Sequence, residues 1–423
     1  MSQLEAGHGC PISMTYAAVP VLRAEPEVAA EWEPKLTALD YDPRLAPLKH
    51  KRAALAGMAM TEKQGGSDVR ANTTRAQPLS EPGAYALTGH KWFCSAPMSD
   101  GFLVLARAPG GLTCFLLPRV LPDGTRNAFR IQRLKDKLGN RSNASAEVEF
   151  EAAWARRVGE EGRGVPTIIE MVNATRLDCL LGSTGLMRAA VAQATHHAAH
   201  RRAFGKALVD QPLMANVLAD LCLESEAATL LAMRLARAVD DAEADPAGRP
   251  FRRLGVAVGK YWVCKTAVGV VAEAVESLGG NGYDEASGMP RLYRETPLNS
   301  IWEGSGNVAA LDVLRAMARE PATVEAFMAE LGEAAGTDRR FDEALPRLKD
   351  ELADPQEAVA RRLVERMAVT LQASLVLRHS PPAVADAFCA SRLDGDRGRA
   401  YGTLPTGVDT AAVVERHRPR RAG

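Results

Sequence analysis

The chain has 423 residues, of which 46% are hydrophobic and 25% are charged, and its formal net charge is zero. This composition is typical of a globular protein with a large core, and it excludes a general attraction to polyanions. The seven cysteines are scattered without a CxxC pair, which argues against a disulfide framework and against structural zinc. No run of eighteen apolar residues and no signal-peptide pattern is present, so we expect a cytoplasmic protein without a membrane partner.

The first half of the chain changes from short helical patterns to β-type patterns. Residues 1–55 contain two short amphipathic patterns, around Met14–Leu22 and Ala29–Leu39, which are too little to pack alone. Residues 56–160 contain short apolar runs separated by Pro-Gly, Gly-Gly and Pro-Asp-Gly turns. These runs are Tyr85–Phe93, Phe102–Ala106, Leu112–Leu117 and Ala146–Phe150. Their spacing predicts a β-barrel or a sandwich.

The second half is helical. Residues 161–318 show helical periodicity with lengths suited to a bundle. The predicted helices are Val165–Arg202, Pro212–Asp240, Phe251–Leu278 and Val308–Arg319. Residues 319–423 add the amphipathic patterns Val324–Leu331, Arg339–Leu352 and Pro355–Leu377, and we expect the Gly-, Pro- and Arg-rich tail from about Gly395 to be disordered. The predicted fold class is therefore α+β, mostly α.

Glu303 is the first candidate for chemistry. It lies between Trp302 and Gly304 in the stretch Tyr293–Asn307, and we predict that Glu303 itself lies on a loop just ahead of the helical pattern Val308–Met317. A carboxylate partly desolvated beside an aromatic ring is suited to act as a general base. The alternative is an acidic residue that is favoured near a helix N-terminus for its interaction with the dipole.

Two stretches of the β-rich region could contact a ligand. Met58–Val69 contains two glycines followed by Ser67, which allow the backbone to approach a ligand; the alternative is a surface turn. Gly89–Ser95 reads as a strand that carries an aromatic pair and then a hydroxyl. A flavin needs a flat apolar wall and a hydrogen-bond donor near its reactive nitrogen, although an ordinary half-buried strand has the same pattern.

Two stretches of the helical region complete the set. Arg201–Gln211 ends a helix with basic residues, which suits either a pyrophosphate or the helix dipole. Leu278–Tyr283 is a turn of backbone donors that follows a helix, so it does not fit a Rossmann fingerprint. His196 and His200 share a helix face, but no acidic ligand lies between them and we expect no metal site.

The five stretches, taken in this order over about residues 10–318, resemble the acyl-CoA dehydrogenase family of flavoproteins. Lys135–Asn143, Cys10–Thr15 and the extra C-terminal helices are similar to its adaptive-response, AidB-type branch. The resemblance implies a remnant N-terminal helical domain (1–55), a central β-barrel domain (56–160), a four-helix bundle (161–318) and an additional helical segment (319–423). It also implies FAD, an acyl-CoA substrate, a homotetramer and an electron acceptor that it does not identify.

The resemblance assigns roles to individual residues. Glu303 would be the catalytic base, and Thr175 stands where some relatives carry theirs. Gln211 would replace a glutamine usually found at the position of Pro212. The implied cofactor-binding residues are Met60, Thr61, Phe93, Ser95, Arg201, Phe204, Gln211, Gly279, Gly280, Gly282, Ser305 and Asn307. The implied substrate-binding residues are Ser67, Arg176 and Trp302.

Two further expectations follow from the same resemblance. The AidB-type branch is linked to protection of DNA from alkylation, which makes a double-stranded DNA-binding flavoprotein the competing function, with phosphate contacts from Arg315, Arg319 and Arg397. A flavin-free scaffold is the third possibility. The N-terminal helical domain of the family is longer than 55 residues, so we expect most of it to be missing from this sequence.

Overall fold

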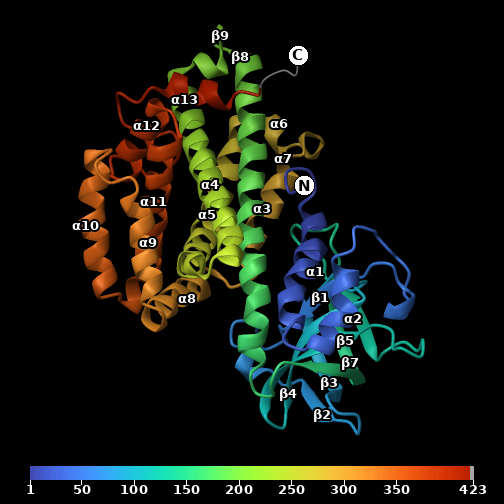
Figure 1. The fold of residues 1–423 in the computed structure, drawn as a ribbon. Helices are drawn as coiled ribbons and strands as arrows, with labels where there is room; N and C mark the ends of the chain where they lie inside the picture. The colour runs from blue at the N-terminus through green and yellow to red at the C-terminus, as the bar shows by residue number, and fades with distance from the viewer. Residues whose placement is uncertain (420–423) are drawn as a thin grey trace. The chain divides into compact units, whose positions relative to one another are not determined.

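The computed structural model describes residues 1–419, which form two compact units: residues 1–178, and the part of the chain that begins at Cys179 (Figure 1). The first unit contains a β-barrel with helices and the second unit is helical. The predicted fold class, α+β and mostly α with a central barrel, is therefore confirmed.

The barrel of the first unit closes through strands that are far apart in sequence. Its order is β1-β4-β2-β3-β7-β5, a further β4–β5 pairing closes the ring, and β6 pairs with β7. The strands are β1 (Ala56–Ala59), β2 (Arg75–Pro78), β3 (Ala84–Ser95), β4 (Gly101–Ala108), β5 (Gly111–Pro118), β6 (Phe129–Leu134) and β7 (Ser145–Val158). All four predicted β-type runs are strands, and β1, β2 and β6 were not predicted.

Strand β4 shows why the runs are continuously apolar. Phe102 and Val104 belong to the cluster inside the barrel, whereas Leu103 and Leu105 belong to a second cluster that includes the N-terminal helices. Successive side chains of a strand point to opposite faces, so a strand that is buried on both faces is apolar at every position.

The N-terminal helices cover this outer face. They are α1 (Gly9–Leu22) and α2 (Pro26–Leu36), preceded by a 3₁₀ turn at Ala6–His8. α1 begins at Gly9, earlier than the predicted pattern around Met14–Leu22. Trp32 lies so close to Gly101 that a Cβ there would be 2.5 Å from the indole, which explains the glycine at the start of β4.

The second unit is built around one apolar helix, α5 (Arg249–Ser277). The unit is entered through α3 (Gly164–His200), which begins in the first unit and ends in the second. The β8–β9 hairpin (Arg202–Ala203, Lys206–Ala207) follows α3. The helices α4 (Pro212–Ala244), α5, α6 (Gly280–Tyr283), α7 (Met289–Asn299) and α8 (Gly306–Arg319) come next. The segment Pro246–Ser277 is long and apolar enough to cross a membrane, but most of it is buried inside the unit, as in the core helix of a bundle.

One expectation about the rest of the unit is confirmed and one is corrected. Glu303 lies on a loop just ahead of a helix, as predicted, because α7 ends at Asn299 and α8 begins at Gly306. The C-terminal region consists of α9 (Ala322–Gly332), α10 (Arg339–Ala353), α11 (Ala360–His379), α12 (Pro382–Arg392) and α13 (Thr410–His417). The tail that we expected to be disordered contains α13, and residues 420–423 lie outside the described part of the chain.

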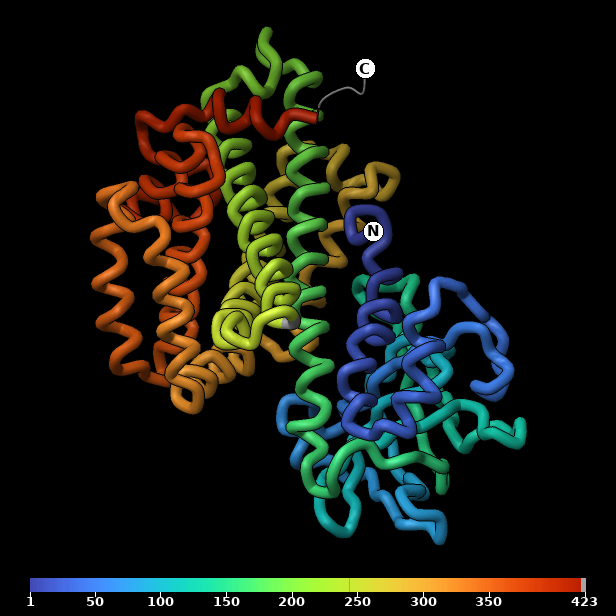
Figure 2. Tube along the Cα trace, in the orientation of Figure 1, coloured from blue at the N-terminus to red at the C-terminus, as the bar shows by residue number. Residues whose placement is uncertain are grey.

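The ordering of α13 has a physical cause. Val413 and Val414 are buried, and α13 packs beside α4 (Figure 2). The side chains of Arg416 and His417 both contact the carboxylate of Glu226 on α4. The composition of the tail did not indicate this helix, because only a few apolar residues of α13 are buried and its other contacts are with the charged side chain of Glu226.

Candidate functional site

The Met60–Thr61 segment lies beside β3 in the first unit. Trp92 donates its backbone N–H to the Thr61 carbonyl at 2.8 Å, and the Asn72 side chain donates to the Met60 carbonyl at 2.9 Å. A Cβ at Gly66 would lie 2.5 Å from Thr61 Oγ1, so the loop that follows can approach this segment only with glycine at that position. The segment is therefore held from two sides.

A fully buried ion pair lies next to this segment, and sequence reasoning did not identify it. Lys91 Nζ lies 2.8 Å from Glu62 Oε1, and it also donates to the carbonyls of Leu105 and Met60. Burial alone would raise the pKa of Glu62, but Lys91 and hydrogen bonds from Thr73 and Thr74 outweigh burial and hold the pKa well below its usual range. A sequence signal for the pair was present: Glu62 lies in the stretch Met58–Val69, and Lys91 lies in the stretch Gly89–Ser95.

Phe93 and Ser95 present an aromatic ring and a hydroxyl on one side of β3. Cys94 between them is fully buried, and the Phe93 side chain is 49% exposed, so the two flanking residues face away from the barrel core. The register of β3 against β7 shifts between Lys91 and Cys94, which indicates a β-bulge at this point. The Lys135 ammonium lies 4.6 Å from the centre of the Phe93 ring.

The hydroxyl of Ser95 has polar neighbours within the same unit. Ser95 Oγ lies 3.4 Å from Ser145 Oγ, and Lys137 Nζ donates to Ser145 Oγ at 2.9 Å. Ser67 is exposed on the loop after Thr61. The first unit thus brings Met60, Thr61, Phe93 and Ser95 onto neighbouring segments, as the Trp92–Thr61 bond shows.

Arg176 and its neighbours lie in the part of α3 that belongs to the first unit. The Arg176 side chain is buried, and its guanidinium lies 3.4 Å from Asn173 Oδ1. Thr175 donates its hydroxyl to carbonyls of the preceding turn and acts there as a buried structural residue. Asp178, which was not predicted, accepts a hydrogen bond from Tyr16 at 2.8 Å, and burial raises its pKa.

Glu303 lies in the second unit on a short loop between α7 and α8. Its backbone is left-handed, with φ of 57°, and Gly304 has φ of 100°. The left-handed region is sparsely populated by residues with a side chain, so the surrounding structure must hold Glu303 there. Lys260 of α5 donates to the carbonyls of Trp302 and Gly304 at 2.9 and 2.5 Å. The side chain of Glu303 is half-buried.

The residues around Glu303 are fixed by further contacts. The Trp302 indole donates to Asn299 Oδ1 at 2.9 Å, and Asn299 donates to Ser183 Oγ at 3.0 Å. Ser305 is the N-cap residue of α8 and has an extended backbone, but its side chain makes no capping hydrogen bond to the helix. Asn307 lies in the first turn of α8 and is exposed. Glu303, Trp302, Ser305 and Asn307 are thus held on one short segment.

The corner between α3 and α4 carries three predicted cofactor residues. Arg201 directly follows α3, and Phe204 and Gly205 occupy the tip of the β8–β9 hairpin with φ of 51° and 80°. Two successive left-handed residues form the tight turn that suits a two-residue hairpin. The Phe204 ring is 97% exposed, and Gln211 donates to the Ala203 carbonyl at 3.1 Å.

The glycine turn after α5 has a conformation that requires glycine. Gly279 has φ of 60° and ψ of −143°, a combination open essentially only to glycine. A Cβ at Gly282 would overlap the carbonyl of Val275, and no atom lies within 4 Å of the equivalent position at Gly280. The turn therefore exposes backbone near Gly280 while Gly282 packs against α5.

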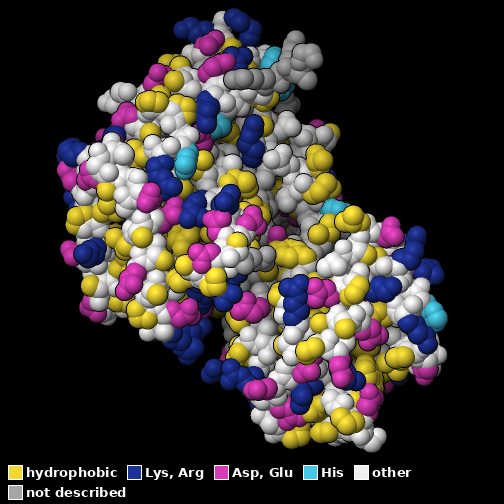
Figure 3. All heavy atoms as spheres, in the orientation of Figure 1, with side chains coloured by type: hydrophobic (Ala, Val, Ile, Leu, Met, Phe, Trp, Pro, Cys, Tyr) yellow, Lys and Arg dark blue, Asp and Glu magenta, His cyan; other side chains and the backbone are white. Residues whose placement is uncertain are grey.

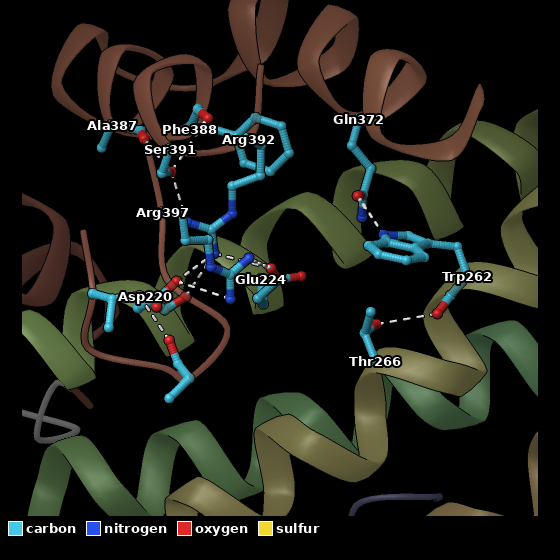
Figure 4. A network of polar contacts seen from close by, with 12 residues as sticks. Asp220, Glu224, Trp262, Thr266, Gln372, Ala387, Phe388, Ser391, Arg392 and Arg397 are labelled. Carbon is cyan, nitrogen blue, oxygen red and sulfur yellow. Dashed lines mark hydrogen bonds and ion pairs between the residues drawn. The ribbon is translucent and has the colours of Figure 1, made fainter. Parts of the chain in front are cut away.

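The three arginines predicted to contact DNA have different surroundings. Arg315 on α8 is 56% exposed and lies 3.6 Å from Asp312, and Arg319 is exposed at the end of the same helix. Arg397 instead lies against Asp220 and Glu224 of α4, together with Arg392 (Figure 4). The Arg397 guanidinium is therefore engaged by two carboxylates of α4, and Arg397 acts as a structural residue here.

Three domain families match the chain. Residues 57–153 match the acyl-CoA dehydrogenase middle domain, residues 162–318 match the acyl-CoA dehydrogenase C-terminal domain, and residues 1–43 match the adaptive response protein AidB N-terminal domain. Together these matches cover most of the chain, and they include the predicted base Glu303 and the predicted cofactor-binding residues.

Relatives in sequence and structure agree with these matches. The chain is 48% identical over 394 residues to the putative acyl-CoA dehydrogenase AidB of Escherichia coli, covering 93% of this chain and 72% of that protein. It is 33% identical to acyl-CoA dehydrogenase family member 11 of Caenorhabditis elegans, covering 84% of this chain and 59% of that protein. The crystal structure of Caenorhabditis elegans ACDH-11 in complex with C11-CoA superposes with a TM-score of 0.81 at 30% identity, covering 91% of this chain and 71% of that one. The chain therefore belongs to the acyl-CoA dehydrogenase family, and its residues 1–43 match the N-terminal domain of the AidB branch.

Proposed function

We propose that this protein is an FAD-dependent enzyme that desaturates an acyl-CoA thioester between its α- and β-carbons, with Glu303 as the base. The observation that carries the proposal is the Glu303 loop, where a half-buried carboxylate is held in a left-handed conformation directly before α8. Backbone held in such a conformation is concentrated at functional sites. The ACDH-11 structure is a complex with C11-CoA, which supports the choice of a CoA thioester.

The residues of the first unit fit a flavin. The acyl-CoA dehydrogenase family uses FAD, and a flavin needs a flat apolar wall with a nearby hydrogen-bond donor. Phe93 supplies a half-exposed aromatic ring, and Ser95 supplies a hydroxyl on the same side of β3. Met60 and Thr61 would hold the cofactor beside them, and the Gly66 contact keeps their loop close.

The remaining cofactor residues lie in the second unit. We assign the pyrophosphate and adenine side to Arg201, Phe204 and Gln211, supported by their common corner between α3 and α4. The Gly279–Gly282 turn would contact the same end of the cofactor through its backbone, and Ser305 with Asn307 would contact it after the base.

The proposed chemistry requires a base with a fixed position. The thioester carbonyl makes the α-hydrogen acidic, and Glu303 would accept that proton. Bound FAD supplies the acceptor for the two electrons that leave with the β-hydrogen as a hydride. Positioning of the base relative to the α-carbon is then the main task of the protein residues, because proton transfer needs hydrogen-bond reach. Arg176, Ser67 and Trp302 would contact the substrate.

A visible absorption spectrum tests this proposal directly. Purified protein should show bound flavin, and one or more members of a panel of straight-chain acyl-CoAs should bleach it without oxygen. A protein that holds no flavin after supply of FAD would contradict the cofactor assignment. A flavin that no acyl-CoA bleaches would contradict the reaction.

The same proposal includes assembly into a homotetramer. The Phe204 ring is almost fully exposed at the tip of a hairpin, next to Arg201, where burial by a second subunit would remove an apolar ring from water. A site that needs residues from two subunits requires at least a dimer. Light scattering of the flavin-loaded protein should therefore exclude a monomer.

A second candidate function is binding to double-stranded DNA. Asp312 accepts two hydrogen bonds from the Arg253 guanidinium, at 2.9 and 3.1 Å. The ion pair between Asp312 and Arg315 is longer, at 3.6 Å, and the Arg315 side chain remains largely exposed, where it could contact a phosphate. Basic and acidic side chains are interspersed on the visible surface (Figure 3), so any attraction would come from a local cluster that includes Arg319. Phosphate contacts of this kind would depend steeply on salt and little on sequence.

A further inference from the structure

Lys260 is one of the largest fully buried side chains among the described residues, with 1% of it exposed. It lies in α5, within an apolar stretch that forms the centre of the second unit. A buried ammonium is costly unless polar groups replace its water. Both hydrogen bonds of Lys260 go to backbone carbonyls on the Glu303 loop, those of Trp302 and Gly304.

These two carbonyls flank the candidate base. The carbonyl of Trp302 belongs to the peptide that precedes Glu303, and the carbonyl of Gly304 belongs to the peptide that follows the glycine. The direction in which the Glu303 side chain leaves the backbone depends on the two peptide planes at its Cα. The first of these carries the Trp302 carbonyl, and the second lies between the two bound carbonyls. A single ammonium that binds both carbonyls at 2.9 and 2.5 Å therefore fixes the backbone on each side of the base.

The backbone of this loop needs such support. Glu303 has a left-handed φ of 57° and Gly304 a φ of 100°, so the loop contains a conformation that residues with a side chain rarely adopt. The hydrogen bonds of Trp302 with Asn299, and of Asn299 with Ser183, hold the aromatic ring beside it. Among these contacts, Lys260 is the one that bridges both sides of Glu303.

We propose that Lys260 is a positioning residue that holds the Glu303 carboxylate in the place from which it removes the α-proton, an inference that rests on the proposed function. Lys260 itself would touch neither substrate nor cofactor. It would act through the two carbonyls and the left-handed backbone of Glu303. Loss of Lys260 should therefore lower the rate of proton removal and leave the affinity for acyl-CoA unchanged.

Three variants separate this role from a general structural one. Lys260→Met keeps the chain length and removes the donors, and Lys260→Arg restores donors that can reach both carbonyls. Arg252→Met is the matched control, since it removes a basic side chain from the same helix eight residues earlier, at a position that is only partly buried. If Lys260→Met does not yield folded protein, Lys260→Gln keeps a shorter neutral donor and replaces it.

Three measurements decide the outcome. Anaerobic rapid mixing with the acyl-CoA that bleaches the parent gives the rate of flavin reduction, and titration with the matching enoyl-CoA gives the affinity. Hydrogen–deuterium exchange of the peptide covering residues 300–306 reports the loop without substrate. We expect Lys260→Met to reduce the rate by about 10²-fold, as misplacement of a catalytic group by about 1 Å does. Its enoyl-CoA affinity should stay at the parental value, and exchange should be faster at 300–306 alone.

The opposite results would overturn the inference. A parental reduction rate in Lys260→Met shows that the lysine does not position the base, as does a slow rate that Lys260→Arg fails to raise. Faster exchange throughout the second unit assigns the lysine a general role in folding. If no acyl-CoA bleaches the parent flavin, the proposed function fails and the catalytic role of Lys260 fails with it. The exchange measurement then still shows whether the lysine holds the loop.

Discussion

The two units each bury one lysine beside candidate site residues, but they compensate its charge in different ways. In the first unit, Lys91 forms an ion pair with the fully buried Glu62 and supports the Met60 carbonyl. In the second unit, Lys260 binds the carbonyls of Trp302 and Gly304. Loss of Lys91 would leave a buried charge, whereas loss of Lys260 would leave two neutral carbonyls. The first lysine therefore matters more for stability, and the second is placed to matter more for catalysis.

The largest effect on stability should come from Lys91→Met. An unpaired carboxylate at Glu62 would be buried without its cation, and breaking a buried ion pair in this way costs about 3–5 kcal/mol. Urea denaturation followed by circular dichroism measures the change. The double variant Lys91→Met with Glu62→Gln is the control, because it removes both charges and should be less destabilised than the single variant. Equal destabilisation of the two would show that the charge of Glu62 is not the cause.

Lys260→Met should destabilise the protein less. It leaves two partly buried carbonyls without a donor, and each unsatisfied buried polar group costs about 1–3 kcal/mol. Lys91→Met also leaves two carbonyls without a donor, those of Met60 and Leu105, and in addition a buried carboxylate. The same urea experiment compares the two lysines directly. A loss of stability as large as that of Lys91→Met would remove the distinction between the units.

The units should also differ in their response to pH. In the first unit, the Glu62 pKa is below its usual value of 4.5, so the pair adds stability above that value and loses it as pH falls. In the second unit, burial would raise the pKa of Glu226, but His417, Arg416 and Ser380 lower it to about 2. Burial would lower the pKa of His417, but hydrogen bonds with Cys222 and Glu226 raise it to about 10.

The docking of α13 on α4 should therefore weaken in both directions of pH. The Glu226 contribution is lost as pH falls from about 4.5 towards 2, and the His417 contribution is lost as pH rises from about 6.5 through 10. Limited proteolysis of the segment 405–419, measured from acid to alkaline pH, should show the strongest protection between about 4.5 and 6.5. In Glu226→Gln the loss of protection at acid pH should disappear, whereas the loss at alkaline pH should persist in reduced form, because Cys222 also raises the pKa of His417. An unchanged profile would mean that other groups control the segment.

Phe204→Ala should affect assembly and leave the stability of the isolated chain almost unchanged. The ring is 97% exposed, so its removal creates no cavity within the chain. If a second subunit covers the ring, the variant should lose FAD. It should also dissociate at protein concentrations at which the parent remains assembled. Gel filtration with visible detection measures both, and parental behaviour would remove Phe204 from the subunit contact.

The smallest effect is expected for Arg315→Gln. It should weaken binding to any duplex by about one phosphate contact and reduce the salt slope by about one unit. Binding to two unrelated duplexes at two salt concentrations provides the comparison. Arg397→Gln serves as a contrast, because its guanidinium pairs with Asp220 and Glu224 and its loss should reduce stability instead. Equal binding by parent and Arg315→Gln would exclude Arg315 from a DNA site.

Much of the fold could be predicted because periodicity reflects burial. The strands β3, β4, β5 and β7 and the long helices followed from apolar runs and turn residues. The short strands β1 and β2 did not, because four residues carry little pattern and their pairing depends on distant segments. α13 was missed because charged contacts with Glu226 order it as much as its few apolar residues do.

The residues that would contact the ligands could be predicted from the sequence, whereas the buried residues that hold them in place could not. Glu303, Phe93 and Ser95 belong to motifs that a sequence displays directly. Lys260 and Lys91 resemble ordinary charged residues in sequence, and only the structure shows that they are buried and which carbonyls they bind. The left-handed backbone of Glu303 was also hidden, because Gly304 alone was the visible sign of an unusual turn.

The most direct test of the central claim compares flavin reduction in the parent and in Glu303→Gln. Both proteins should show the spectrum of bound FAD, because the substitution keeps the size of the side chain. With the acyl-CoA that bleaches the parent, Glu303→Gln should react more slowly by about 10²–10⁴-fold, which is the contribution of a positioned base. Reduction at the parental rate in this variant would contradict the claim that Glu303 removes the α-proton.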